Sequence, residues 1–479
     1  MMDMTGMAEA VRAGETTPEA LLDEALARMA AVNPELNAVV LSFEETARRK
    51  IAEGLPEGPL RGVPFLLKDL GAEARDFPAH NGSRLLANTT YDYDSEIYLR
   101  LAAAGLVVFG RTAAPEGGVG AATEAVVYDG PARNPWDTGR TPGGSSGGSG
   151  AAVAAGIVPG AHGSDGGGSV RIPASNCGLV GFKPTRARLP DGPGAGEGWA
   201  GMATDGFLTR TVRDQALLLD LCTGPDPGEP YTAPPLGGTF LGACAGARKP
   251  LRVAVCPNTL MGERVHPDCV AAAEATGRLL ADMGHHVEEV ARVAADTDAM
   301  MQAWCGIVAC GTALWIDRKL ARLGRGLRED DVEPLARSAR DYGRAMSGPD
   351  YLAAIEAIHA YGREMARVFE DIDILVTPTM AEPPAAVGRF SHQRGDYLDY
   401  RMGEDGVFAY SPFTAAFNAS GQPAVSLPMH WSEEGLPIGA HVAGRFGEDL
   451  AVMALAADLE RAQPWAHRVP PVWAGGQAS

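Results

Sequence analysis

Apolar and polar residues follow two different periods along the chain, which predicts an alternation of helices and strands. In "TTPEALLDEALARMAAV", apolar residues recur at helical spacing after a threonine, a proline and a glutamate, residue types that open helices. The segments "DSEIYLRLAAAG", "DCVAAAEATGRLLADMG" and "EDLAVMALAADLERA" are also predicted helices, and "SGGSGAAVAAGIV" predicts a closely packed helix of small residues. Short apolar runs predict strands, namely "GVPFLLKDL", "LVVFGRT", "LRVAVCPN", "HHVEEV", "DILVTPT", "AVSLP" and "IGAHVAG".

A block of helices is expected over about residues 299–370, with "DYLAAIEAIHAYGREMARVF" as its clearest amphipathic member. Together, the helices and strands predict an α/β fold in which one large mixed, mainly parallel β-sheet is covered by helices on both faces. A length of 479 residues would by itself allow roughly two to four domains. The chain has no internal repeat, and we interpret the proline- and glycine-rich segment 224–238 as a surface excursion rather than a linker.

Charge and cysteine usage exclude several classes of protein. The net charge of -19 argues against a nucleic-acid-binding surface, which needs a basic stripe. The seven cysteines form no CxxC pair, which indicates a reducing compartment. No HExxH or similar spacing is present, so we expect neither a metal nor another cofactor. The chain shows no run of 18 apolar residues and no signal-peptide pattern, so we expect a cytoplasmic protein without a membrane span.

Two glycine–serine clusters lie within the segment 141–175 and raise the question of their chemistry. Neither cluster matches GxxxxGK[ST] or a strand followed by GxGxxG, which argues against phosphate or dinucleotide binding. "GGSSG" matches the GxSxG nucleophile elbow with Ser145 or Ser146, and His441 or His467 would then be the base. An elbow needs a strand before it, but "ARNPWDTGRTP" is loop-like, and a lone histidine is usually structural.

The second cluster, "DGGGS", places Ser169 directly after three glycines. Bare backbone N–H groups beside a serine are what an oxyanion hole requires. The base could be a lysine, provided that burial keeps it neutral, and Lys68 stands at the end of the apolar run "VPFLL". Asp69 follows directly and is expected to point to the opposite face of the strand. A solvated lysine on the surface remains the alternative.

These motifs together resemble the amidase signature family. "TPGGSSGGSGAAVA", "HGSDGGGSVRIPAS" and the lysine motif "GVPFLLKDL" occur in the family's order, and the two serines of the pattern lie 24 positions apart. Further similar segments are "LNAVV", "ARNPWD", "CGLVGFKPT", "DILVTPT", "FNASGQPAVSLP" and "GLPIGAHVAG". The resemblance covers Glu9 to Pro470, which implies that residues 1–479 form a single amidase domain with its core at 9–470.

The resemblance implies a serine hydrolase that cleaves amides through an acyl-enzyme. Ser169 would be the nucleophile, Ser145 the bridging serine and Lys68 the base, with a cis peptide bond between Gly144 and Ser145. The other implied roles are an oxyanion and substrate-binding site at Gly166, Gly167, Gly168, Gly118 and the Ser169 N–H, a supporting hydrogen bond from Ser146, and bracing of the loop by Asp165 and Arg171.

One subfamily is more similar than the rest, the 6-aminohexanoate cyclic-dimer hydrolases. In those enzymes a cysteine in the later helical block touches the substrate amide, and "QAWCGIVACG" places Cys305 at the matching position. A buried apolar thiol is the structural alternative. The chain departs from that subfamily in having "DGGGS" where alanines flank the serine, and in "RLPDGPGAGEGWAGMATDG". The substrate could therefore also be another amide, an aryl acylamide, an ester or a carbamate.

A second function class is the amidase subunit of a glutamyl-tRNA amidotransferase. That subunit typically has asparagine after "KD", whereas Leu70 stands here, which favours a standalone hydrolase. The expected partner is a small amide molecule, with no nucleic acid and no membrane, and a homodimer is one assembly that the resemblance allows. Specificity is expected to reside in the segments 191–205 and 300–413.

Overall fold

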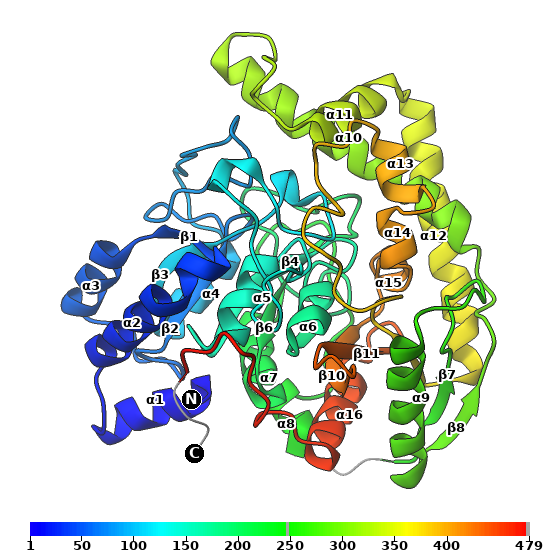
Figure 1. The fold of residues 1–479 in the computed structure, drawn as a ribbon, viewed down its shortest axis with the longest axis horizontal. Coiled ribbons are helices and arrows are strands. Elements are labelled where there is room, and N and C mark those ends of the chain that lie inside the picture. Colours follow the sequence, from blue (N-terminus) through cyan, green and yellow to red (C-terminus); the bar gives the residue numbers. More distant parts are fainter. Residues whose placement is uncertain (246–248, 476–479) are drawn as a thin grey trace.

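The computed structural model describes residues 1–245 and 249–475 and is built on a single sheet of 11 strands (Figure 1). The strand order is β1-β3-β2-β4-β6-β5-β10-β11-β9-β7-β8. The strands are β1 Val39–Ser42, β2 Pro64–Lys68, β3 Val107–Thr112, β4 Gly160–Asp165, β5 Val180–Lys183, β6 Thr204–Thr209, β7 Arg252–Val255, β8 His286–Glu289, β9 Ile374–Pro378, β10 Ala424–Trp431 and β11 Pro437–Gly444.

Helices cover both faces of this sheet, as the sequence predicts (Figure 1). They are α1 Met4–Ala13, α2 Pro18–Leu36, α3 Glu44–Glu53, α4 Glu96–Ala103, α5 Gly147–Ala154, α6 Arg171–Cys177, α7 Val212–Cys222, α8 Phe240–Ala245, α9 Pro267–Asp282, α10 Thr297–Leu323, α11 Pro334–Ala345, α12 Gly348–Asp371, α13 Tyr397–Met402, α14 Val407–Tyr410, α15 Thr414–Ser420 and α16 Asp449–Ala462, with short 3-10 turns at Glu116–Gly118 and Val126–Tyr128.

The predicted mixed sheet is confirmed, but the expectation that it is mainly parallel is wrong. Strand β2 pairs in parallel with β3 and β4, and β7 with β8 and β9, whereas the other described pairings are antiparallel. The reason lies in β6, which enters between β4 and β5 and runs antiparallel to both. A crossover helix between two strands predicts that they are parallel, but it does not show that they are neighbours.

The helical block predicted at about 299–370 corresponds to α10, α11 and α12. Helix α10 has 27 residues and a mean hydropathy of 1.5 in its most apolar window, so it meets the length and composition of a membrane span. These two criteria alone do not show a membrane span, so the expectation of a protein without one stays a prediction. Two thirds of that window (67%) is buried inside the protein, which is the pattern of a helix in a protein core.

The alternation of side chains along β2 brings the lysine motif to one face of the sheet. Phe65 and Leu67 pack in the hydrophobic cluster that includes residues of α7 and α16. Leu66 packs on the other face, with residues of α2 and α5. Lys68 lies two residues further along β2 and is fully buried on the side of α5. Because side chains alternate along the strand, Lys68 points to the same face as Leu66. On this face lies the first glycine–serine cluster, which continues into α5.

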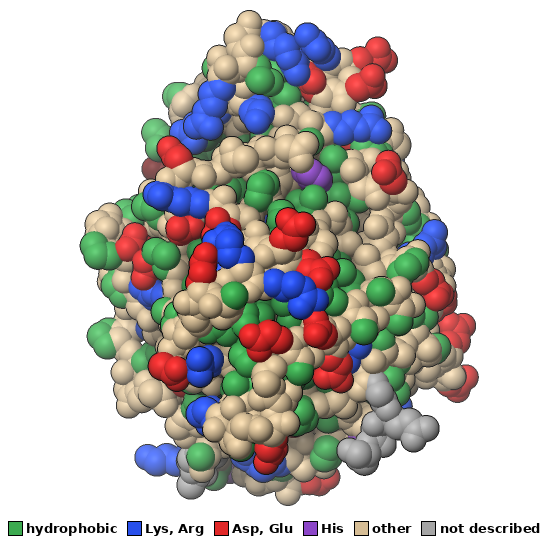
Figure 2. Space-filling view, turned by 90° about the vertical axis from the view of Figure 1, so that its left-hand side faces the viewer, with side chains coloured by type: hydrophobic (Ala, Val, Ile, Leu, Met, Phe, Trp, Pro, Cys, Tyr) green, Lys and Arg blue, Asp and Glu red, His purple; other side chains and the backbone are tan. Residues whose placement is uncertain are grey.

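Charges on the outside are mixed in sign. On the face shown in Figure 2, lysine and arginine side chains are interspersed with aspartate and glutamate. This face therefore carries no continuous basic stripe of the kind that binds a nucleic-acid backbone.

Helix α5 can lie against the sheet only because its residues are small. A Cβ atom added at Gly148 would lie 2.3 Å from the Ala113 backbone nitrogen and 2.6 Å from the Ala38 carbonyl oxygen. Both obstacles are backbone atoms, which cannot rotate away. Gly148→Ala is therefore expected to destabilise the protein by about 1–3 kcal/mol, although alanine favours helices.

The matched control is Gly326→Ala, since Gly326 is exposed and an added Cβ would meet nothing within 4 Å. We expect this control to change the free energy of unfolding by less than about 0.5 kcal/mol. Urea-induced and thermal unfolding of the two variants measure the difference. Equal stabilities of Gly148→Ala and the wild type would contradict the packing described for α5.

Candidate active site

Lys68 is fully buried, and its surroundings provide hydroxyl groups rather than a carboxylate. Its Nζ lies 2.6 Å from the Ser145 Oγ and 2.9 Å from the Ser164 Oγ. Burial lowers the pKa of this amine from its ordinary value of 10.5 to about 7, although the charges of Asp205 and Asp165 oppose the shift. The neutral amine is thus a main form near pH 7 and a proton acceptor for a serine.

The neighbouring carboxylate of Asp69 is turned away from the lysine, as expected for adjacent strand residues. It accepts a hydrogen bond from the backbone N–H of His80 at 2.9 Å and another from the hydroxyl of Tyr128. Asp69 therefore does not hold the Lys68 ammonium in its charged form.

The first glycine–serine cluster presents Ser145 to Lys68. The peptide bond between Gly144 and Ser145 is cis, as the resemblance implies. Gly118 lies on the other side of this serine, where an added Cβ would be 3.6 Å from the Ser145 Oγ. Ser146 is the predicted supporting residue, and its backbone N–H donates to the carbonyl of Ser169 at 3.1 Å. Its side chain bridges the N–H and the carbonyl of Ser164, both at 3.2 Å.

The second cluster forms a tight loop after β4 in which every backbone carbonyl is held. The four carbonyl oxygens of residues 166–169 all accept hydrogen bonds. Their donors, in chain order, are the Trp304 indole Nε1 at 3.0 Å, the Thr414 hydroxyl at 2.6 Å, the Ile172 N–H at 2.7 Å and the Ser146 N–H at 3.1 Å. Because these hydrogen bonds fix the orientation of each peptide unit, they also fix the directions in which the N–H groups of the loop point.

The N–H of Gly168 is not available for an oxyanion, which corrects the expectation for that residue. It donates to the Asp165 carboxylate at 2.7 Å. The N–H groups of Gly166, Gly167 and Ser169 have no acceptor among the described residues. Gly168 has a φ of +127°, and an added Cβ there would be 2.2 Å from the Thr414 Oγ1, so no other residue fits.

Asp165 and Arg171 form the predicted brace of the loop and are both fully buried. The guanidinium donates to both carboxylate oxygens at 2.9 Å, and the carboxylate also accepts from the Val170 N–H and the Asn418 amide. Burial alone would raise the pKa of Asp165. The charge and hydrogen bonds of Arg171, with a further hydrogen bond from Asn418, outweigh this effect of burial. The pKa of Asp165 therefore lies well below its ordinary value. The carboxylate therefore stays ionised and fixes the loop.

The alternative nucleophile elbow finds no support in the geometry. No strand precedes Ser145 or Ser146, and the segment 141–146 is irregular. His441 is fully buried, and its Nε2 lies 3.0 Å from the Arg171 guanidinium, so the ring supports the brace instead of contacting a serine. His467 is exposed in the C-terminal segment.

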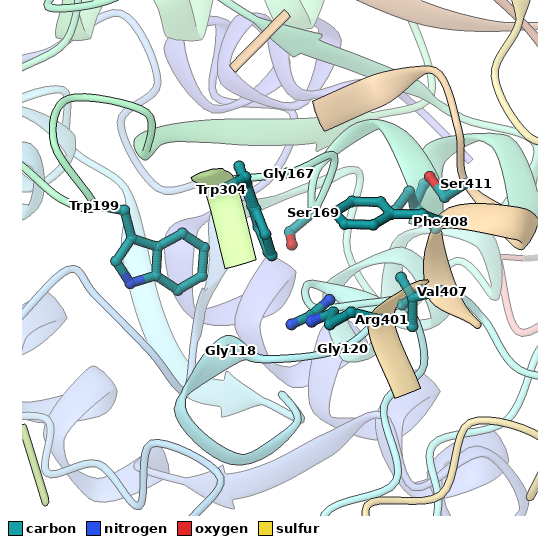
Figure 3. A pocket seen from close by; sticks show the side chains of 12 residues that line it. Gly118, Gly120, Gly167, Ser169, Trp199, Trp304, Arg401, Val407, Phe408 and Ser411 are labelled. Atoms are coloured by element: carbon teal, nitrogen blue, oxygen red, sulfur yellow. The ribbon is translucent and has the colours of Figure 1, made fainter. Parts of the chain in front are cut away.

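A narrow cavity that is partly open to solvent lies at Ser169 (Figure 3). Aromatic rings form its walls, with the Trp304 ring 5.6 Å from that of Trp199 and 5.4 Å from that of Phe408. The lining residues are Gly118, Gly120, Ala121, Gly167, Ser169, Ile172, Trp199, Trp304, Arg401, Val407, Phe408 and Ser411. The two segments expected to determine specificity, 191–205 and 300–413, therefore both contribute residues to the wall of the cavity.

Cys305 does not line this cavity, which contradicts the expectation that its side chain forms part of the substrate-binding site. The residue is fully buried in the core of the helical block, where burial raises the pKa of its thiol to about 12. Its backbone carbonyl accepts a hydrogen bond from the Tyr397 hydroxyl at 3.0 Å. The preceding residue, Trp304, faces the cavity instead.

Sequence reasoning did not identify several residues of the site. Ser164 and Ser145 both contact Lys68, Thr414 and Asn418 hold the loop of residues 165–169, and Trp304 and Arg401 line the cavity. The signal for Ser164 was present in "HGSDGGGS", since it is the last hydroxyl before the loop. The others lie more than 130 positions from the loop, and no local pattern marks them. Within the described residues, no group of acidic, histidine or cysteine side chains is arranged to hold a metal.

Comparison with known proteins identifies the family. The family model described as Amidase matches residues 20–453. The chain is 38% identical over 476 residues to the 6-aminohexanoate-cyclic-dimer hydrolase of Paenarthrobacter ureafaciens, with 98% of this chain and 96% of that one covered. The chain belongs to the amidase signature family. It is thus a hydrolase that acts on carbon–nitrogen bonds, and the family predicted from the motifs is confirmed.

Solved structures of relatives share the architecture of this amidase. A 6-aminohexanoate cyclic dimer hydrolase complexed with substrate matches with a TM-score of 0.91 and 36% identity, covering 98% of this chain and 99% of that one. A bacterial aryl acylamidase matches with a TM-score of 0.87 and 29% identity, covering 97% of both chains. The predicted α/β amidase fold is thereby confirmed.

The buried Asp165–Arg171 pair gives this amidase a testable dependence of stability on pH. Asp165→Asn keeps the size of the side chain but leaves the Arg171 charge unpaired, so we expect a loss of about 3–5 kcal/mol at pH 7. The pKa of Asp165 is lower in the folded protein than in the unfolded chain, where it is about 4. The stability that the ionised carboxylate contributes is therefore complete above about pH 4 and is lost as the pH falls through the pKa of the folded protein. The difference in unfolding free energy between Asp165→Asn and the wild type should therefore become smaller below about pH 4.

Glu274→Gln serves as the control, because the Arg278–Glu274 pair at 3.5 Å is exposed. Its effect should stay below about 0.5 kcal/mol. Chemical unfolding of both variants between pH 3 and pH 8 measures the two quantities. A deficit for Asp165→Asn that matches the control at pH 7 would contradict the bracing role.

Proposed function

We propose that this amidase hydrolyses carboxylic amide bonds of small non-peptide molecules through an acyl-enzyme on Ser169. Lys68 acts as the base and Ser145 as the bridge between the two. The observation that carries the proposal is the 2.6 Å contact between the Lys68 Nζ and the Ser145 Oγ, made by a fully buried amine whose pKa lies at about 7.

Acylation uses the two hydroxyl groups as a proton relay. Neutral Lys68 accepts the Ser145 proton, Ser145 accepts the Ser169 proton, and the Ser169 oxygen attacks the amide carbonyl carbon. The carbonyl oxygen becomes an oxyanion, which the N–H groups of Gly166, Gly167 and Ser169 can hold by hydrogen bonds. When the intermediate collapses, the C–N bond breaks, and the departing nitrogen takes a proton from Ser145, which regains one from protonated Lys68.

Deacylation repeats the same relay with water. A water molecule gives its proton through Ser145 to Lys68 and adds to the ester carbonyl carbon. Collapse of the second intermediate breaks the bond to the Ser169 oxygen, which recovers a proton, and releases the carboxylic acid. The amine and the acid are the two products, and Lys68 ends the cycle neutral.

Two substrate groups fit the walls of the cavity. The relative from Paenarthrobacter ureafaciens acts on the cyclic dimer of 6-aminohexanoate, which favours a cyclic or linear aliphatic amide. Aryl acylamides are the second candidate, because Trp199, Trp304 and Phe408 offer ring faces to an aromatic amine. Turnover of a cyclic amide dimer, a linear amide, an anilide and an aryl carbamate separates them, and activity on the carbamate alone would contradict the proposed amide chemistry.

Removal of the nucleophile should abolish hydrolysis without unfolding the protein. Ser169→Ala deletes one oxygen atom that makes no described side-chain hydrogen bond, so the melting temperature should stay close to that of the wild type. Loss of kcat/KM by several orders of magnitude is expected for such a change. His467→Ala should leave kcat/KM unchanged. Near-normal turnover by Ser169→Ala, with a loss in His467→Ala, would instead support the nucleophile elbow.

The pH profile tests the base. Because the base must be neutral, kcat/KM should rise with pH along one main ionisation centred at about 7, the pKa of Lys68. Lys68→Met should remove this limb together with most of the rate. Lys68→Arg should not restore activity, because a guanidinium stays protonated. An active Lys68→Arg enzyme with the wild-type profile would show that the base lies elsewhere.

A further inference from the structure

A positive charge faces the cavity without an anionic partner. Arg401 of α13 is 3% exposed and lines the same cavity as Ser169. Figure 3 shows its guanidinium directed into the space beside Ser169 and Trp304. Within the described residues, no carboxylate forms an ion pair with it, and its Nε has no hydrogen-bond partner.

Neutral aromatic rings surround this guanidinium. Its central carbon lies 4.9 Å from the ring centre of Trp304, 5.5 Å from that of Tyr400 and 5.8 Å from that of Tyr397. Ring faces attract a cation but do not neutralise it. Among the described residues, the lining of the cavity contains no aspartate or glutamate. The wall of the cavity therefore supplies no negative charge that balances Arg401.

Other buried arginines of the protein donate to carboxylates or to backbone carbonyls. Arg171 donates to Asp165, and Arg188 donates to Asp449 at 2.9 Å. Arg111 donates to backbone carbonyls, including that of Lys68 at 2.7 Å. Arg401 has a side-chain hydrogen bond with Tyr397 but no anionic partner among the described residues. A buried guanidinium without an anionic partner costs free energy, and this one lies beside Ser169.

We propose that Arg401 binds a carboxylate of the substrate, so that the preferred substrates are amides whose acyl or amine half carries a free carboxylate. This inference rests on the proposed function, since it names the substrate class of the same site. A guanidinium presents a planar pair of donors that matches a carboxylate, and their attraction is strengthened away from water. A neutral carbonyl would accept a hydrogen bond but would leave the charge unbalanced.

Arg401 also packs on Trp304, whose indole holds the Gly166 carbonyl, so its replacement can slow every substrate. The test therefore compares matched substrates within each enzyme. Succinyl p-nitroanilide and its methyl ester differ in charge on the acyl half, and 4-acetamidobenzoate and its methyl ester differ on the amine half. The pair that shows discrimination identifies the half that Arg401 contacts.

In the wild type, we expect kcat/KM for one carboxylate to exceed that for its methyl ester by more than about tenfold. Arg401→Met should reduce this ratio by roughly 10- to 100-fold, and Arg401→Lys should retain part of it. The control is Arg389→Met. Arg389 also stacks on aromatic rings, at 5.0 Å from Phe390, but it pairs with Glu382 and lies outside the cavity lining. A uniform loss on both members of each pair would assign Arg401 a general role in the rate and overturn the inference.

Binding without turnover separates this inference from the proposed function. Calorimetric titration of the Ser169→Ala protein with hexanoate and with hexanamide requires no hydrolysis. Hexanoate should bind more than about tenfold more tightly, and Arg401→Met should remove the difference while Arg389→Met preserves it. Equal affinities of the two probes would overturn the carboxylate site even if the amides are hydrolysed. Tight hexanoate binding by an enzyme that hydrolyses none of the anilides would contradict only the proposed function.

Discussion

The site depends on an amine that is buried without a counter-ion in contact. Lys68 ends a strand inside the sheet, and the groups within reach of its Nζ are two hydroxyls. Desolvation disfavours the ammonium, and the acids that oppose this, Asp205 and Asp165, are not bonded to the amine. A lysine in such a place lowers the stability of the fold, and the same burial makes it a base near neutral pH.

In the loop of residues 165–169, by contrast, a buried charge is fully paired. Asp165 is ionised and fully compensated by Arg171, Asn418 and two backbone N–H groups. Because the carbonyls of the loop are held as well, its conformation is set before any substrate arrives. An amine without a counter-ion in contact and a fully compensated carboxylate thus share the same end of the sheet. In the proposed mechanism each requires the other, because Lys68 can act only on a serine whose position is fixed.

Sequence was informative where a residue's role follows from its neighbours in the chain. The apolar run before Lys68 predicted its burial, and three glycines before Ser169 predicted a loop of bare N–H groups. Spacing and the resemblance then placed Ser145 with them. The family and most elements of the fold were predicted in the same way.

Sequence failed where distant segments decide the outcome. The entry of β6 between β4 and β5 reverses the expected strand directions, and no local pattern encodes strand order. The Gly168 N–H is lost to Asp165 through the folding of the loop on itself. Cys305 and Trp304 are adjacent on a helix, so which of them faces the cavity depends on the packing of α10. Arg401 has no anionic partner among the described residues, and only the folded structure reveals this.

The most direct test of the central claim needs no knowledge of the substrate. Phenylmethanesulfonyl fluoride reacts with activated serines, and mass spectrometry of peptides locates the label. We expect labelling of Ser169, at a rate that rises with pH around a midpoint of about 7, and no labelling in Lys68→Met. Labelling of another serine, or a rate at Ser169 that does not change between about pH 6 and pH 9, would contradict the central claim.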